Sequence, residues 1–232
     1  MCGRYTLRAR PRAIAEDFDL PEVPRIEPRF NISPNQPVAV IGFDSNEGTR
    51  RLDFLTWGLV PPWADDPGIG DHMINARAET VADKPSFRHA FRTQRCLVVA
   101  DGFYEWKRQD GWKRPYFIHM KDDRPFAFAG LWEHWEKGDE PIYSCTLLTT
   151  DANEVLAPIH DRMPVILPRS AYDLWLDPRV HDPKRLQHLL VPFAADEMEA
   201  YPVSRLVNDP ENDLPDCVQP IKREGWIPGM SP

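Results

Sequence analysis

The sequence lacks any long hydrophobic run, which argues against a membrane-spanning helix. No apolar stretch approaches the ~20 residues that such a helix needs. The first ten residues, Met1–Arg10, contain three arginines and no apolar segment of the kind found in a secretory signal peptide. We therefore expect a soluble, cytoplasmic protein with no membrane partner.

Closely spaced cysteines are also missing. The four cysteines stand at positions 2, 96, 145 and 217, too far apart for a zinc knuckle or a CxxC redox site. Cys96 and Cys145 lie in apolar, strand-like runs, which predicts buried and unreactive thiols. In a reducing compartment the thiols should stay free. Because the sequence has no metal or nucleotide motif either, we expect no metal and no small-molecule cofactor.

Glycine is scarce, with 12 residues, whereas proline is abundant, with 25. Many prolines shorten helices and interrupt strands. Strand-like apolar runs occupy residues 38–43, 52–57, 96–100, 103–107, 116–120, 126–132, 142–149 and 164–167. Because helices do not alternate regularly with these runs, we predict an α+β fold with a mostly antiparallel, barrel-like β core and short peripheral helices. We expect one monomeric domain over residues 1–232, with a core of about 2–208 and a loosely ordered tail at 209–232.

The formal net charge is −8, which argues against indiscriminate coating of DNA. The charge is unevenly distributed, because residues 84–114 hold 8 basic and 3 acidic side chains, a net of +5. An acidic protein can therefore present one basic face, although an ordinary solvated surface explains the charges equally well.

Cys2 is the first candidate for chemistry. Removal of Met1 would give an α-amine and a thiol on adjacent carbons, with ordinary pKa values of about 8 and about 8.5. The amine can form a Schiff base with an aldehyde, and the thiolate can then close a thiazolidine ring on the same carbon. If Met1 stays attached, the Cys2 nitrogen is an amide and the chain is the unprocessed precursor. A packing role for Cys2 remains the alternative from position alone.

Three polar segments supply possible partners for Cys2. Asn75 and Arg77 would share one face of a strand, where they can orient a sugar or the N-terminus and grip a phosphate. Glu105 is surrounded by aromatic residues, which favours an acid/base role, although a structural ion pair is equally compatible. His160 is a candidate proton shuttle within His-Asp-Arg, and a structural role is its alternative.

Two tryptophans are candidates for stacking on unpaired bases, a contact worth ~1–3 kcal/mol per base. Trp63 lies in a Pro- and Asp-rich loop, which favours exposure. Trp106 follows Glu105 directly.

An ordered set of motifs resembles the SOS-response-associated peptidase (SRAP) family of abasic-site-processing proteins. The matching segments run from residue 1 to about residue 208 and include Met1-Cys2-Gly3-Arg4-Tyr5, Trp57-Gly58-Leu59-Val60-Pro61, Asn75-Ala76-Arg77-Ala78-Glu79-Thr80, Asp101-Gly102-Phe103-Tyr104-Glu105-Trp106 and His160-Asp161-Arg162-Met163-Pro164. Each motif alone is weak, whereas their shared order is specific.

The resemblance implies a DNA-damage role with single-stranded DNA containing abasic sites as the partner. It implies a thiazolidine crosslink through Cys2 after self-removal of Met1, an associated lyase step, and phosphate contacts from Arg4, Arg77 and Arg162. In this scheme the Cys2 amine attacks C1′ of the open sugar, His160 is the general acid, Glu105 is the general base and Asn75 orients the sugar and the N-terminus. About three phosphate contacts predict a log–log salt slope of roughly −2.

Two other functions fit parts of the sequence. Met-Cys-Gly also opens N-terminal-nucleophile amidohydrolases such as class II glutaminases, in which the Cys2 thiol would attack an amide. A non-catalytic reader of single-stranded DNA would use the arginines and tryptophans while Cys2 stays inert. A covalent adduct that depends on Cys2 separates these hypotheses from crosslinking.

Overall fold

The computed structural model describes residues 2–45, 47–109 and 111–221. The predicted loss of Met1 and the last part of the predicted tail, residues 222–232, lie outside the described residues.

The apolar runs of the sequence form a closed ring of strands. In ring order these are β10 (Ile142–Asp151), β4 (Thr49–Trp57), β3 (Pro37–Asp44), β6 (Arg95–Ala100) and β9 (Phe126–Trp135), and β9 pairs again with β10. The ring has few exposed strand edges, and its interior packs Val, Leu, Phe and Trp side chains. Most pairs are antiparallel, whereas β4 pairs with β10 in parallel. The predicted α+β fold with a barrel-like core is confirmed.

Three short strands extend the ring along β10 and β9. They are β5 (Asn75–Arg77), which pairs in parallel with β10, β11 (Arg162–Pro164), which pairs with the end of β10, and β12 (Ile166–Leu167), which pairs with β9. The motifs that carry Asn75 and Arg162 are thereby attached to the same strand.

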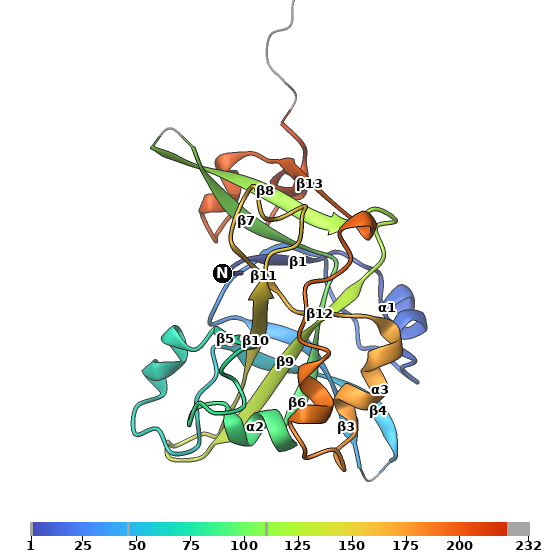
Figure 1. The fold of residues 1–232 in the computed structure, drawn as a ribbon, viewed down its shortest axis with the longest axis vertical. Coiled ribbons are helices and arrows are strands. Elements are labelled where there is room, and N and C mark those ends of the chain that lie inside the picture. Colours follow the sequence, from blue (N-terminus) through green and yellow to red (C-terminus); the bar gives the residue numbers. More distant parts are fainter. Residues whose placement is uncertain (1, 46, 110, 222–232) are drawn as a thin grey trace, which may run out of the picture.

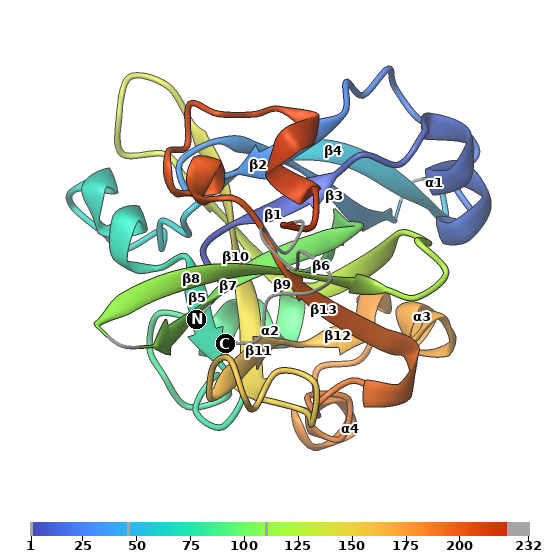
Figure 2. The same cartoon turned by 90° about the horizontal axis from the view of Figure 1, so that it is seen from above.

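A second sheet lies across one end of the ring, as Figures 1 and 2 show. Its order is β13 (Met198–Pro202), β8 (Trp112–Met120), β7 (Gly102–Gln109), β1 (Tyr5–Leu7) and β2 (Arg29–Ile32). Gly102 allows the first strand to lie close to β7, because a Cβ at this position would come within 2.2 Å of the Phe117 ring and 3.1 Å of the Thr6 hydroxyl. The N-terminal strand β1 is therefore held within the second sheet, between β7 and β2.

The helices are short, as the proline content predicts. They are α1 (Pro11–Phe18), α2 (Arg88–Thr93), α3 (Tyr172–Leu176) and α4 (Lys184–Gln187), with 3₁₀ turns η1 (Pro67–His72), η2 (Arg169–Ala171), η3 (Ala195–Glu197), η4 (Arg205–Asn208) and η5 (Pro215–Val218). The Phe18 ring of α1 stacks on Tyr172 of α3, with centroids 5.3 Å apart. None of the helices within the described ranges is both long enough and apolar enough to cross a membrane.

The predicted loose tail is not loose over residues 209–221. The Asp213 carboxylate accepts hydrogen bonds from the backbone N–H groups of Phe30 and Asn31 and pairs with Arg29. Cys217 is fully buried in a small apolar cluster with Tyr104 and Phe117. Composition alone pointed to disorder, but the acidic residues that suggested it serve as acceptors for strand β2.

Candidate active site

A buried carboxylate fixes the start of the chain beside β7. Asp101 accepts hydrogen bonds from the Thr6 hydroxyl at 2.5 Å and the Ala9 N–H at 2.7 Å, and it also binds the backbone and side chain of Arg8. Tyr5 pairs with Phe103, and the Tyr104 N–H donates to the Arg4 carbonyl at 3.0 Å. Because this ladder continues toward residue 2, it positions Cys2 next to the strand that carries Glu105.

The Cys2 side chain has no exposed surface. Its Sγ lies 3.7 Å from the Arg4 carbonyl oxygen. Burial raises the pKa of the Cys2 thiol, and the negative charge of Glu105 raises this pKa further. A buried thiol is ionised less readily than the solvated thiol whose ordinary pKa is about 8.5.

Asn75 contacts Cys2 directly. Strand β5 aligns Asn75 with Leu147 of β10, and the Asn75 Nδ2 donates to the Cys2 carbonyl oxygen at 2.8 Å. The amide oxygen of Asn75 is buried and has no hydrogen-bond partner within the described part of the chain. A buried, unpaired acceptor is costly, so this oxygen is placed to receive a donor from another molecule or from a rearranged N-terminus.

Glu105 is a buried carboxyl, with 3% of its surface exposed, on the face of β7 opposite Tyr116 of β8. Burial raises the pKa of Glu105, and nearby positive charge, including that of His160, opposes the rise. The charge of Glu105 in turn affects the pKa of Cys2. Glu105 therefore couples electrostatically to both of the other predicted proton-handling groups.

His160 precedes β11 and has a partner in either protonation state. Its Nδ1 accepts from the Arg162 N–H at 3.0 Å, which suits the neutral ring with its proton on Nε2. The same Nδ1 lies 2.9 Å from the Asp161 carboxylate, which suits the protonated ring. The His160 side chain is 28% exposed, so the ring can be reached from solvent.

The three predicted phosphate-binding arginines differ sharply in their surroundings. Arg4 donates to the Asn31 side chain and to the carbonyls of Val207 and Asn208, at 2.8 to 3.2 Å, and burial lowers its pKa. Arg162 binds Glu79 through both terminal nitrogens, at 2.7 and 3.0 Å. These contacts commit Arg4 and Arg162 largely to the protein itself.

Arg162 also binds Asp151 at 2.9 Å, and the hydrogen bond to Glu79 raises the pKa of Arg162. Arg77, in contrast, is exposed, and its side chain forms no ion pair or hydrogen bond with another described residue. Sequence reasoning could not find Asn31, Glu79 and Asp151 as partners, because they lie 27, 83 and 11 residues away along the chain.

Neither of the two tryptophans predicted to stack on bases lies in the group formed by Cys2, Asn75, Glu105 and His160. Trp63 is 51% exposed but belongs to a loop next to Asp65 and Asp66, and its neighbour Ala64 packs against Trp135 and Ile142 near the start of β10. Trp106 is half-buried, and its Nε1 donates to the Asn208 side chain at 2.8 Å on the opposite face of β7 from Glu105. Trp63 is therefore placed away from the group, and Trp106 anchors the C-terminal segment.

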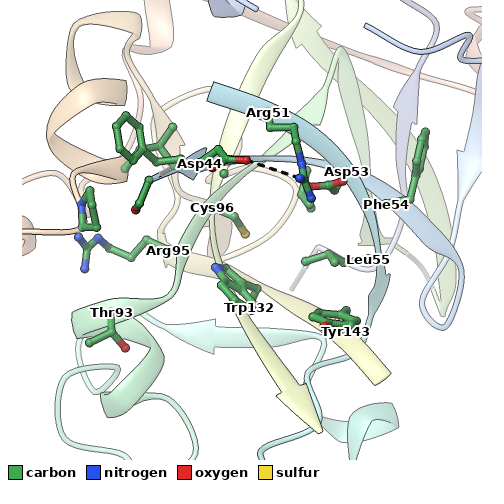
Figure 3. A pocket seen from close by; sticks show the side chains of 16 residues that line it. Asp44, Arg51, Asp53, Phe54, Leu55, Thr93, Arg95, Cys96, Trp132 and Tyr143 are labelled. Carbon is green, nitrogen blue, oxygen red and sulfur yellow. Dashed lines mark hydrogen bonds and ion pairs between the residues drawn. The ribbon is translucent and has the colours of Figure 1, made fainter. Parts of the chain in front are cut away.

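A pocket of about 560 Å³ opens at the other end of the ring, and Figure 3 shows its lining. Its charged side chains bind one another or the backbone. Arg51 pairs with Asp53 at 2.8 Å and with Asp44 at 3.5 Å, and the Arg95 guanidinium donates to four backbone carbonyls. Across the described ranges, no cluster of three or more His, Cys, Asp and Glu side chains is arranged to hold a metal ion.

Comparisons with known proteins agree with the motifs. The family profile described as "SOS response associated peptidase (SRAP)" matches residues 1–210. The chain is 48% identical over 225 residues to abasic site processing protein YoqW of Bacillus subtilis, covering 94% of this chain and 99% of that protein.

Two further likenesses extend the comparison. Abasic site processing protein HMCES of Gallus gallus is 34% identical over 229 residues, covering 85% of this chain and 68% of that protein. A crystal structure of a protein from Bacteroides thetaiotaomicron superposes with a TM-score of 0.84 at 26% identity, covering 95% of this chain and all of the other.

Proposed function

Because the chain belongs to the SOS-response-associated peptidase family, we propose that it processes abasic sites in single-stranded DNA by forming a covalent crosslink through Cys2. Relatives from a bacterium and a vertebrate bear the name abasic site processing protein, which supports abasic DNA as the target. Cys2, Asn75, Glu105 and His160 are the proposed catalytic residues.

The observation that carries this proposal is the surroundings of Cys2. Asn75 donates a hydrogen bond to the Cys2 carbonyl oxygen at 2.8 Å, and its buried amide oxygen has no partner among the described residues, while Glu105 interacts electrostatically with both Cys2 and His160. Three polar side chains from three separate segments are thus linked to Cys2, Asn75 and Glu105 directly and His160 through Glu105. An inert packing cysteine would not require such polar neighbours.

The proposed reaction begins with hydrolysis of the Met1–Cys2 peptide bond, which frees the α-amine of Cys2. This amine attacks C1′ of the ring-opened sugar and loses water to give an imine, with Glu105 accepting a proton from nitrogen and His160 donating one to the departing oxygen. The Cys2 sulfur then bonds to the same carbon while the thiol proton passes to nitrogen. The product is a thiazolidine ring in which the nitrogen and the sulfur bonded to C1′ both belong to Cys2.

The buried thiol suits this order of events. Because burial raises its pKa, the Cys2 thiol stays protonated and poorly nucleophilic until the imine carbon is held next to it. The amine therefore reacts first and the thiol closes the ring. We propose that the protein acts as a monomer in the cytoplasm. Burial also protects the Cys2 thiol from oxidation before DNA binds.

A denaturing gel tests the proposal. Mature protein, confirmed by mass spectrometry to lack Met1, is incubated with a single-stranded oligonucleotide that contains one abasic site. We expect a covalent band that migrates more slowly than the free DNA by nearly the mass of the chain, which is 26.8 kDa with Met1, and Cys2→Ala should abolish it. Protein that retains Met1 should give no band.

Two results would contradict the proposal. The absence of any adduct with mature wild-type protein would favour the non-catalytic DNA reader, and turnover of free glutamine that depends on Cys2 would favour the amidohydrolase.

A shortened DNA strand on the same gel would show the associated lyase step.

A further inference from the structure

The hairpin formed by β7 and β8 carries an unusual set of cations. Its distal part holds four basic side chains, Lys107, Arg108, Lys113 and Arg114, and none has an ion pair or hydrogen bond with another described residue. Elsewhere arginines are commonly paired with carboxylates, as Arg12 is with Glu16 and Arg179 is with Asp177. In an acidic protein, four neighbouring cations that have no partner among the described residues form a local positive field.

The strand register divides these cations between two faces. Lys107 is opposite Arg114, and both share the face of Glu105 and Tyr116, because side chains alternate along a strand. Arg108 is opposite Lys113 on the other face, which is the face of Tyr104 and Trp106. That second face is covered farther down the hairpin by the C-terminal segment, through the apolar cluster around Cys217.

The face with Lys107 and Arg114 continues directly from the proposed active site. Lys107 lies two residues beyond Glu105, which is about 7 Å along the strand, and the Arg114 side chain begins about 5 Å from that of Lys107. The hairpin projects beyond the body of the molecule on the side where the N-terminus lies, in both Figure 1 and Figure 2. A chain that enters the Cys2 site from this side must pass these two cations.

We propose that Lys107 and Arg114 form a second phosphate-binding surface that holds the DNA strand flanking the abasic site. This inference rests on the proposed function. Glu105 and Gln109 lie about 13 Å apart along β7, which matches roughly four nucleotides at the 3.4 Å spacing of one stacked strand. The hairpin therefore binds flanking nucleotides, while Arg77, whose exposed side chain has no ion pair or hydrogen bond within the described ranges, is the cation assigned to the abasic site itself. Because the surface contacts phosphates and no bases, it adds affinity without sequence preference.

The test compares the two faces of the same hairpin. The host is Cys2→Ala, which allows equilibrium binding, and the probe is a fluorescent 11-nucleotide single strand with a central tetrahydrofuran abasic analogue. Two double variants remove equal charge: Lys107→Gln with Arg114→Gln on the site face, and Arg108→Gln with Lys113→Gln on the other face. Circular dichroism confirms that both variants fold.

We expect the site-face variant to bind about 25-fold more weakly at 0.1 M salt, with a log–log salt slope shallower by about 1.4, since each single-strand phosphate contact contributes about 0.7. The matched variant should lose less than about threefold, because its cations act only through the general field. Equal losses in both variants, or an unchanged slope in the site-face variant, would overturn the inference.

Two probes with the abasic analogue near opposite ends refine the test. Because one flank follows the hairpin, the site-face variant should impair only one of the two probes, and equal impairment of both would contradict a strand held on one side. The outcome is separable from that of the proposed function. If mature wild-type protein crosslinks abasic DNA and the hairpin variants bind normally, only the second surface is wrong. If no crosslink forms, the proposed function fails whatever the hairpin does.

Discussion

The two ends of strand β10 can be compared, because one borders a pocket and the other borders the candidate active site. The end near Tyr143 opens into a pocket of about 560 Å³, yet its charged side chains are paired with one another or with backbone carbonyls. The end near Asp151 borders Asn75 and His160, where a buried amide oxygen has no partner within the described ranges. The difference teaches that volume alone does not mark a site for chemistry, because the charged side chains around the pocket are already paired.

The largest expected effect comes from equivalent carboxyl-to-amide changes at the two ends. Glu105→Gln removes the proposed base and should slow crosslinking about 10²- to 10⁴-fold. Asp53→Asn breaks only a partly exposed pair with Arg51 and should change the rate less than about twofold. Single-turnover rates with abasic DNA measure both. Comparable losses in the two variants would remove the distinction between the ends.

The pH dependence follows from the burial of Glu105. Since burial raises the pKa of Glu105, the wild-type rate should increase with pH above the ordinary glutamate value of about 4.3, by up to about tenfold per unit, and Glu105→Gln should lose this rise. A wild-type profile that is flat over this range would contradict the base assignment.

The same shift affects stability. Because the folded state binds the Glu105 proton more tightly than the unfolded state, the free energy of unfolding should fall as pH rises from the ordinary value through the raised value. Glu105→Gln should reduce this fall, which thermal unfolding at several pH values would measure. A variant whose stability falls as steeply as that of the wild type would show that other groups dominate.

A smaller effect is expected at Asn75. Asn75→Ala removes the hydrogen bond to the Cys2 carbonyl and should slow crosslinking roughly 5- to 30-fold, corresponding to about 1–2 kcal/mol of positioning. Asn35→Gly is the control, because the Asn35 amide donates to exposed Asp71 and glycine tolerates the left-handed backbone at this position. Crosslinking at the wild-type rate in Asn75→Ala would mean that the ladder of β1 and β7 positions Cys2 unaided.

The smallest effects separate two arginines near the β10 end. Arg77→Gln should make the salt slope shallower by about 0.7 and leave unfolding unchanged, because Arg77 is exposed and has no partner among the described residues. Arg162→Gln should leave the slope unchanged and cost about 1 kcal/mol of stability, because Arg162 is committed to Glu79 and Asp151. If Arg162→Gln instead made the salt slope shallower and Arg77→Gln reduced stability, Arg162 would be the phosphate contact.

Local pattern was enough to predict the long strands of the ring but not its closure. The runs that became β3, β4, β6, β9 and β10 are rich in apolar, β-forming residues bounded by turns. Strands β1, β2 and β5 have three or four residues, too few for a periodic signal. The pairing of β4 with β10 joins residues almost ninety positions apart, so it cannot be predicted from local sequence.

The candidate site was predictable by residue type and less so by environment. Asn75, Glu105 and His160 were singled out by their chemistry; in the structure Asn75 and Glu105 interact with Cys2, and His160 interacts with Glu105. The burial of Cys2 and the hydrogen bond from Arg4 to the distant Val207 carbonyl could not be predicted, because both are properties of the folded chain.

The contacts of Asp213 and Cys217 bear on how the protein should be produced. A recombinant chain cut at residue 210, where the family match ends, would lose the acceptor for the Phe30 and Asn31 amides and uncover the rings of Tyr104 and Phe117. Exposed aromatic surface of this kind promotes aggregation. The Tyr201 hydroxyl also donates to the Val218 carbonyl, and the Ile221 N–H donates to Pro202, so the C-terminal end of an expressed fragment belongs no earlier than residue 221.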